Sequence, residues 1–75
     1  MRVIDTKKGY DGVTYRIVDD ANPNYNYHDI VIEKLIEDKE TNFWIPLGVR
    51  FHEEETAKAW FERLINMKIN HKNSK

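Results

Sequence analysis

The most regular pattern in this chain is an alternation of apolar and other residues between positions 43 and 51. Every second position is apolar: Phe43, Ile45, Leu47, Val49 and Phe51. A period of two predicts a β-strand with one buried face, which leaves Trp44 and Arg50 on the opposite face. Pro46 cannot donate to a strand ladder, so it predicts a sheet edge or a position beside a bulge. Gly48 predicts the bulge.

The pattern changes to a helical period after Glu53. Apolar residues then recur at steps of three and four: Ala57, Trp60, Phe61, Leu64 and Met67. This spacing predicts an amphipathic helix that starts near Glu53, ends around positions 68–70 and buries this stripe. The acids at 53–55 fall in the first turn, where carboxylates interact favourably with the positive end of the helix dipole.

The earlier part of the chain predicts three more extended segments. Residues 2–6 and 13–18 are expected to be strands joined by the turn Gly9-Tyr10-Asp11-Gly12, and 19–26 a loop containing Asn-Pro-Asn. Residues 29–38 fit two interpretations. Lys34 interrupts their alternation, and a helix capped by Asp29 is the alternative to a strand. Their β-branched run and the polar turn at 38–42 favour the strand.

These elements predict an α+β fold of the order β-β-β-β-α. An antiparallel sheet of three to four strands would carry one C-terminal helix across one face. The helix stripe is expected to pack against the apolar positions of 43–51, with Val13, Tyr15 and Ile17 beside them. We expect a single small domain over residues 1–69 and a frayed basic tail over 70–75.

Length and composition narrow the class of protein. A chain of 75 residues makes one domain and buries only about 60% of its unfolded surface. The absence of cysteine excludes disulfides, thiolate catalysis and cysteine-based zinc sites. The start of the chain has Asp5 where a signal peptide would begin its apolar stretch, and the apolar run 43–49 is too short to span a membrane. We therefore expect a cytoplasmic protein without a membrane partner.

Charge is unevenly distributed along the chain. Residues 1–62 hold eight Lys/Arg and thirteen Asp/Glu, a net charge of −5, whereas residues 63–75 carry +4. The four basic residues of that last segment are Arg63, Lys68, Lys72 and Lys75. An acidic body with a short basic tail argues against a broad phosphate-binding face.

No motif for catalysis, metal or cofactor binding is present. His28-Asp29 and His52-Glu53 could supply metal ligands, but they lack HxH or HExxH spacing and are expected at opposite ends of a hairpin unit. The only serine, Ser74, lies in the tail, and adjacent acids are better explained as turn and helix-start residues. We expect no enzyme activity, no metal and no cofactor.

Nucleic-acid binding is the alternative function that we weigh. Small domains with three strands and a helix lay a sheet face into the DNA major groove. Residues 49–60 resemble the strand-to-helix junction of phage integrase arm-binding domains, in which a strand-ending Phe precedes an acidic helix start. This chain departs from that pattern, because the expected reading face offers Trp44 and Arg50 instead of a row of basic residues. The candidate contacts would be Arg50, Arg63, Lys68 and Lys72.

Aromatic residues favour a protein partner instead. Trp44 is expected on the open sheet face, and Tyr25 and Tyr27 lie in a polar loop with no periodic reason for burial. Exposed Trp, Tyr and Arg anchor protein interfaces, so we take Trp44, Arg50, Tyr25 and Tyr27 as candidate partner-binding residues. The function predicted is a small protein-binding module, of the kind found among phage or mobile-element accessory proteins or inhibitors of larger enzymes. A homodimer formed through strand edges or sheet faces is compatible with either function.

Overall fold

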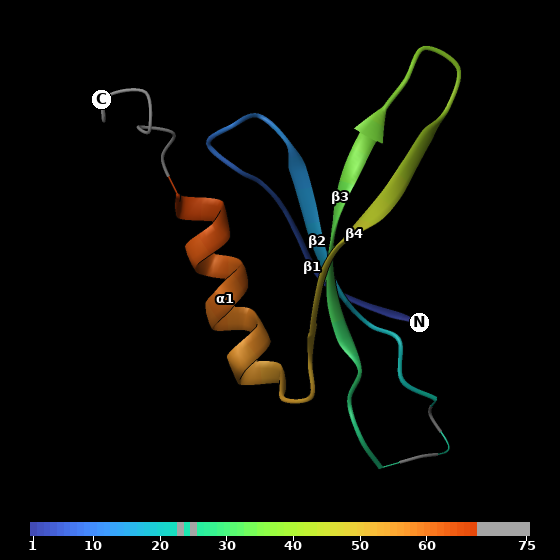
Figure 1. Cartoon of the computed structure of the whole chain (residues 1–75), viewed down its shortest axis with the longest axis vertical. Helices are drawn as coiled ribbons and strands as arrows, with labels where there is room; N and C mark the ends of the chain where they lie inside the picture. Colours follow the sequence, from blue (N-terminus) through green and yellow to red (C-terminus); the bar gives the residue numbers. More distant parts are fainter. Residues whose placement is uncertain (23, 25, 68–75) are drawn as a thin grey trace.

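The described residues form a four-stranded sheet and one helix (Figure 1). The computed structural model describes residues 1–22, 24 and 26–67. The strands follow one another across the sheet in chain order, each antiparallel to its neighbour, so the predicted α+β fold of the order β-β-β-β-α is confirmed. The elements are β1 (Arg2–Lys8), β2 (Thr14–Asp19), β3 (Ile30–Glu37), β4 (Asn42–Phe51) and α1 (Glu54–Asn66).

The segment that fits two interpretations is the strand β3, inside the sheet. It pairs with β2 along one edge and with β4 along the other. Ile30 and Ile32 are fully buried there. Pairing on both edges satisfies the backbone polar groups that a helix would satisfy internally, and β-branched side chains pack well in such a sheet. Tertiary pairing therefore decides in favour of the strand.

The glycine in β4 marks a bulge, as predicted. Val31 pairs with Arg50 and Glu33 pairs with Pro46, so β4 residues 47–49 lie opposite Ile32 alone. Gly48 has a φ of 90°, which side chains with a Cβ rarely adopt. Pro46 lies beside this bulge, on the outermost strand of the sheet. The bulge preserves the alternation of faces on both sides of it.

The core lies over the two central strands instead of over β4. Its cluster joins the helix to β2 and β3 and contains Tyr15, Ile17, Ile30, Ile32, Ala57, Phe61 and Ile65. Leu47 and Phe51 are only partly buried against it, and Phe43 is 46% exposed. The expectation that the helix stripe packs against residues 43–51 is therefore wrong for Phe43, whereas Leu47 and Phe51 do pack against the core, beside Val13, Tyr15 and Ile17. The reason is the position of α1, which lies along the β1–β2 hairpin (Figure 1). Of β4, only Leu47 and Phe51 pack against the core that the helix covers.

The buried stripe of α1 is also displaced from the predicted one. Ala57, Phe61 and Ile65 are buried at successive four-residue steps. Trp60 is 38% exposed and Met67 is 59% exposed, so both lie at the margin of the stripe. Trp60 contacts Phe51, with their ring centroids 6.0 Å apart.

Across the described residues, no helix is long and apolar enough to cross a membrane.

The two hairpins of the sheet diverge away from their common base (Figure 1). The last turn of α1 lies beside the β1–β2 turn, because Gly9, Tyr10, Ile65 and Asn66 line one small hollow. The β3–β4 turn lies on the far side of β1 and β2 from the helix (Figure 1). Sheet twist separates neighbouring hairpins in this way. We call residues 34–45, the part of β3 and β4 beyond the helix, the distal hairpin.

Candidate functional site

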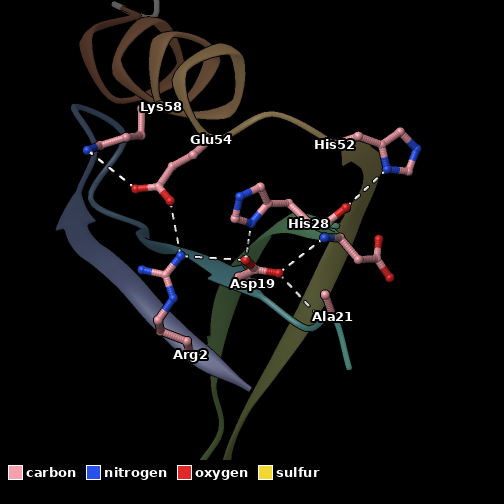
Figure 2. Close-up of polar contacts among 8 residues, drawn as sticks. Arg2, Asp19, Ala21, His28, His52, Glu54 and Lys58 are labelled. Atoms are coloured by element: carbon pink, nitrogen blue, oxygen red, sulfur yellow. Dashed lines mark hydrogen bonds and ion pairs between the residues drawn. The ribbon is translucent and has the colours of Figure 1, made fainter. Parts of the chain in front are cut away.

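A buried carboxylate organises the base of the sheet, where β2 ends (Figure 2). Asp19 is 8% exposed, and its Oδ2 lies 2.7 Å from Nδ1 of His28. Its Oδ1 accepts hydrogen bonds of 3.1 Å from the backbone N–H groups of Ala21 and Asp29. The bond with His28, assisted by these two N–H groups, holds the pKa of Asp19 well below its usual range against the opposing effect of burial.

The same network ties the first strand to the helix (Figure 2). A guanidinium nitrogen of Arg2 lies 3.5 Å from Asp19 Oδ2 and 3.0 Å from Glu54 Oε1. Glu54 also pairs with Lys58 at 3.8 Å, one helical turn further on. The hydrogen bond with Arg2 lowers the pKa of Glu54. The start of β1, the end of β2 and the first turns of α1 are thereby held together.

The structure brings the two histidine segments together, contrary to expectation. His52 Nδ1 lies 3.1 Å from the backbone oxygen of His28. The reason is antiparallel pairing, which sets the start of β3 beside the end of β4: Ile30 pairs with Phe51. Even so, no three His, Asp or Glu side chains within the described part of the chain gather as metal ligands.

The chemistry of this network is that of a structural clamp. Both oxygens of Asp19 are occupied by donors, and a carboxylate with a strongly lowered pKa is a weak base. No described buried side-chain nitrogen or oxygen lacks a hydrogen-bond partner. The buried polar groups of the network are therefore paired with one another.

The sheet face away from the helix carries a different arrangement, centred on Trp44. Strand register puts Trp44 on this face. Trp44 pairs with Leu35, which shares a face with Glu33 two residues earlier in β3. Glu33 pairs with Arg16, which points away from the helix because its neighbours Tyr15 and Ile17 point into the core. The guanidinium carbon of Arg16 lies 4.2 Å from the centroid of a Trp44 ring, and its Nε donates a 2.7 Å hydrogen bond to Glu33. Trp44 is half-buried under this ion pair. Its ring is held in one orientation by a cation–π contact.

The distal hairpin carries apolar side chains on both of its faces, with Lys34 among those on the helix side. Leu35, Trp44 and Pro46 lie on the face away from the helix. Ile36, Phe43 and Ile45 lie on the helix side, because Ile45 pairs with Lys34, which in turn pairs with the core residue Tyr15. None of these three belongs to the core cluster. We call Ile36, Phe43 and Ile45 the hairpin strip.

A second apolar surface, left open by the residues that the structure describes, lies along the last turns of the helix. An open hollow of about 530 Å³ is lined there by Trp60, Arg63, Leu64, Asn66 and Met67. We call these five residues the helix hollow. Sequence reasoning missed this surface because it assigned Trp60 and Met67 to the core. The sequence signal for this surface is the spacing of Trp60, Leu64 and Met67, which are four and three residues apart. This spacing shows that they share one side of the helix, but it does not show whether the sheet covers that side.

The predicted partner-binding residues do not form one patch. Arg50 lies at the base of the sheet, where it donates a 2.6 Å hydrogen bond to Asp29. Trp44 pairs with Leu35, four residues along β3 from Val31, the partner of Arg50, which is about 13 Å at the rise of a strand. Tyr27 is half-exposed in the loop that enters β3 at the base, far from Trp44 along the strand. Tyr25 lies outside the described residues.

The candidate nucleic-acid contacts are also separated. Arg50 is on the sheet face away from the helix, whereas Arg63 lines the helix hollow. Two basic side chains on the open face, Arg16 and Arg50, are paired with carboxylates. Lys68 and Lys72 lie outside the described residues. In the part of the chain that the structure describes, the predicted contacts do not line a common surface.

No protein-family model, curated protein or solved structure matches this chain.

Proposed function

We propose that this chain is a small, non-enzymatic, cytoplasmic protein-binding module that recognises a partner protein through its distal hairpin. The observation that carries this proposal is the hairpin's position: it extends past the helix with apolar side chains on both faces. Phe43 is 46% exposed on one face, and Trp44 is half-buried on the other. Contiguous apolar surface of this kind marks interaction sites on small domains.

Trp44 is suited to anchor such an interface. Trp and Arg are enriched among the residues that dominate binding energy, and here Arg16 stacks on the Trp44 ring. Because Glu33 fixes the guanidinium, the stack is formed before a partner arrives. Less side-chain freedom is then lost on binding.

The free edge of β4 contributes less than its side chains. Pro46 removes a backbone donor and the bulge at Gly48 bends the strand, two features that protect sheet edges from pairing. Strand addition would be limited to the short segment before Pro46. Side-chain contacts are therefore proposed as the main source of affinity.

The role of an accessory protein or of an inhibitor of a larger enzyme belongs to this proposal. It is supported by the apolar surface that the distal hairpin leaves exposed, which includes Phe43. Arg50, Tyr25 and Tyr27 would contribute to a second contact at the base of the sheet and are not part of the distal hairpin contact.

The test is site-specific cross-linking in extract of the source cells, with nuclease treatment. A photoreactive residue is placed at Lys39 in the β3–β4 turn, and a control at Lys58 on the exposed side of α1. We expect a defined protein adduct from position 39 alone, abolished by Trp44→Ala, while the melting temperature of Trp44→Ala stays close to that of the parent chain. Equal adducts from both positions, or unfolding of Trp44→Ala, would reject the distal hairpin as the binding surface.

A further inference from the structure

The hairpin strip and the helix hollow are two apolar surfaces that the described residues leave open. The strip presents Ile36, Phe43 and Ile45 from one side of a hairpin. The hollow presents Trp60, Leu64 and Met67 along one side of a helix, with room for several side chains in its 530 Å³. Phe43 and Met67, the most exposed member of each set, are 46% and 59% exposed.

Charge is complementary between the same two regions. The turn that ends the distal hairpin contains Glu37, Asp38, Lys39 and Glu40, a net charge of −2. Arg63 lines the helix hollow, and the chain beyond it to residue 75 contains basic residues and no acid. If the hairpin strip enters the helix hollow, the acidic turn beside the strip therefore lies near Arg63.

The two surfaces cannot meet within one chain. The β1–β2 hairpin lies between the distal hairpin and the last turns of α1 (Figure 1). The distal hairpin and the last turns of α1 nevertheless lie toward the same end of the long axis of the molecule (Figure 1). In a twofold dimer, each strip would enter the hollow of the other copy, so that the contact would be made twice.

We propose that the hairpin strip recognises a second copy of this chain. In the resulting twofold dimer, the hairpin strip of each protomer packs into the helix hollow of the other, with the acidic turn beside Arg63. This inference goes beyond the proposed function, because the hairpin strip and Trp44 lie on opposite faces of the distal hairpin. The Trp44 face stays uncovered in the dimer and is the surface for any different protein.

The test is sedimentation equilibrium of the purified chain with single substitutions in each surface. We expect the parent chain to be a dimer at about 100 μM. Phe43→Glu and Met67→Glu should each raise the dimer dissociation constant by about tenfold or more, since each places a charge in the apolar contact. Matched controls are Val3→Glu, at an equally exposed position on β1, and Ala59→Glu, on the exposed side of α1. Both controls should leave the dimer unchanged.

Mixing the two defective variants separates this geometry from other dimers. Phe43→Glu retains an intact hollow and Met67→Glu retains an intact strip, so a mixture forms one complete contact and should dimerise more tightly than either variant alone. Arg63→Glu should weaken the dimer, and adding Glu40→Lys in the same chain should restore it. A dimer that Met67→Glu leaves intact, or a mixture no tighter than its components, would overturn the exchange of strip and hollow.

Failure of the dimer is distinguishable from failure of the proposed function. A parent chain that stays monomeric at about 100 μM would overturn the second copy as partner. Cross-linking from position 39 in cell extract then decides separately whether another protein binds the distal hairpin. Circular dichroism of every variant identifies any that lose the fold, and Phe43→Ser is the milder substitution if Phe43→Glu does.

Discussion

The hydroxyl of Tyr15 donates a 2.6 Å hydrogen bond to Oδ2 of Asp11, so a core aromatic ring is tied to the β1–β2 turn. Oδ1 of the same carboxylate accepts from the backbone N–H of Val13 at 3.0 Å. Burial is the main cause that raises the pKa of Tyr15 to about 12, and the bond to Asp11 adds to it. The bond from Tyr15 is in turn the main cause that lowers the pKa of Asp11.

Alkaline titration should therefore show a late tyrosine. Because the folded pKa of Tyr15 exceeds the ordinary value of 10.0, its contribution to stability is fully present below pH 10 and is lost as the pH rises toward about 12. We expect a component of the tyrosinate absorbance near pH 12 that is absent in Tyr15→Phe. The melting temperature of Tyr15→Phe should also fall less steeply across this window. An identical titration for the two proteins would contradict the buried position of Tyr15.

The Asp19 network predicts acid sensitivity of the opposite sign. A carboxyl whose folded pKa lies below its ordinary value of 3.8 stabilises the fold above that value, and this contribution is lost as the pH falls below it. Asp19→Asn should cost about 1–3 kcal/mol at pH 7 and flatten the stability profile at acid pH. The check is the free energy of unfolding, measured with urea from neutral to acid pH. The control is Asp5→Asn, which removes a half-exposed carboxylate from β1. Equal acid profiles for Asp19→Asn and the parent chain would contradict this assignment.

Adjacent aromatic residues on α1 should differ strongly in their effect on stability. Phe61 is 2% exposed in the core, whereas Trp60 is 38% exposed at its margin. Phe61→Ala should cost about 3–5 kcal/mol through cavity formation, enough to unfold most of so small a domain. Trp60→Ala should cost about 1 kcal/mol. Thermal and urea unfolding of both variants, with Phe61→Leu as a folded intermediate case, give the comparison. If Trp60→Ala lowered the free energy of unfolding more than Phe61→Ala, the assignment of Phe61 to the core and of Trp60 to its margin would be contradicted.

The bulge in β4 predicts a backbone cost at Gly48. A Cβ at this position would meet no atom within 4 Å, so Gly48→Ala creates no clash, but the φ of 90° is strained for alanine. We expect a loss of about 1 kcal/mol in the free energy of unfolding. Gly12→Ala, with a φ of 83° and equally open surroundings, should behave alike. Gly9→Ala tests the other case, because its Cβ would lie 3.1 Å from the Tyr15 ring. Unchanged stability in Gly48→Ala would mean that the bulge is not formed.

Nucleic-acid binding is expected to be weak. At physiological salt we expect no affinity for duplex or single-stranded DNA tighter than about 10 μM, because the acidic body opposes phosphate contacts. Fluorescence anisotropy over a range of salt concentrations provides the measurement. Micromolar binding that weakens steeply with salt would reverse the ranking of functions. Arg50→Ala and Arg63→Ala would then be the first variants to test, followed by Lys68 and Lys72.

The position of the helix explains where sequence reasoning about the core went wrong. Alternation in β4 and the helical period after Glu53 were sufficient to predict both elements, since periodicity reports which residues share a face. Periodicity does not report how much of a face is covered. Ile65 is buried and Met67 is exposed because α1 lies along the β1–β2 hairpin, and the same position of the helix leaves Phe43 exposed. The position of the helix depends on sheet twist and on contacts between residues distant in the sequence.

The candidate site divides in the same way. The alternation alone placed Trp44 and Arg50 on the sheet face away from the helix, and the glycine in β4 alone marked the bulge. Only the tertiary structure showed that His28 and His52 meet, that Trp44 and Arg50 lie at opposite ends of the hairpin, and that Arg16 covers the Trp44 ring. Strand pairing brings together His28 and His52, which are 24 positions apart in the sequence, and Arg16 and Trp44, which are 28 positions apart. A face is a local property of the backbone, but a neighbour across the sheet is set by register, which the whole assembly of strands decides.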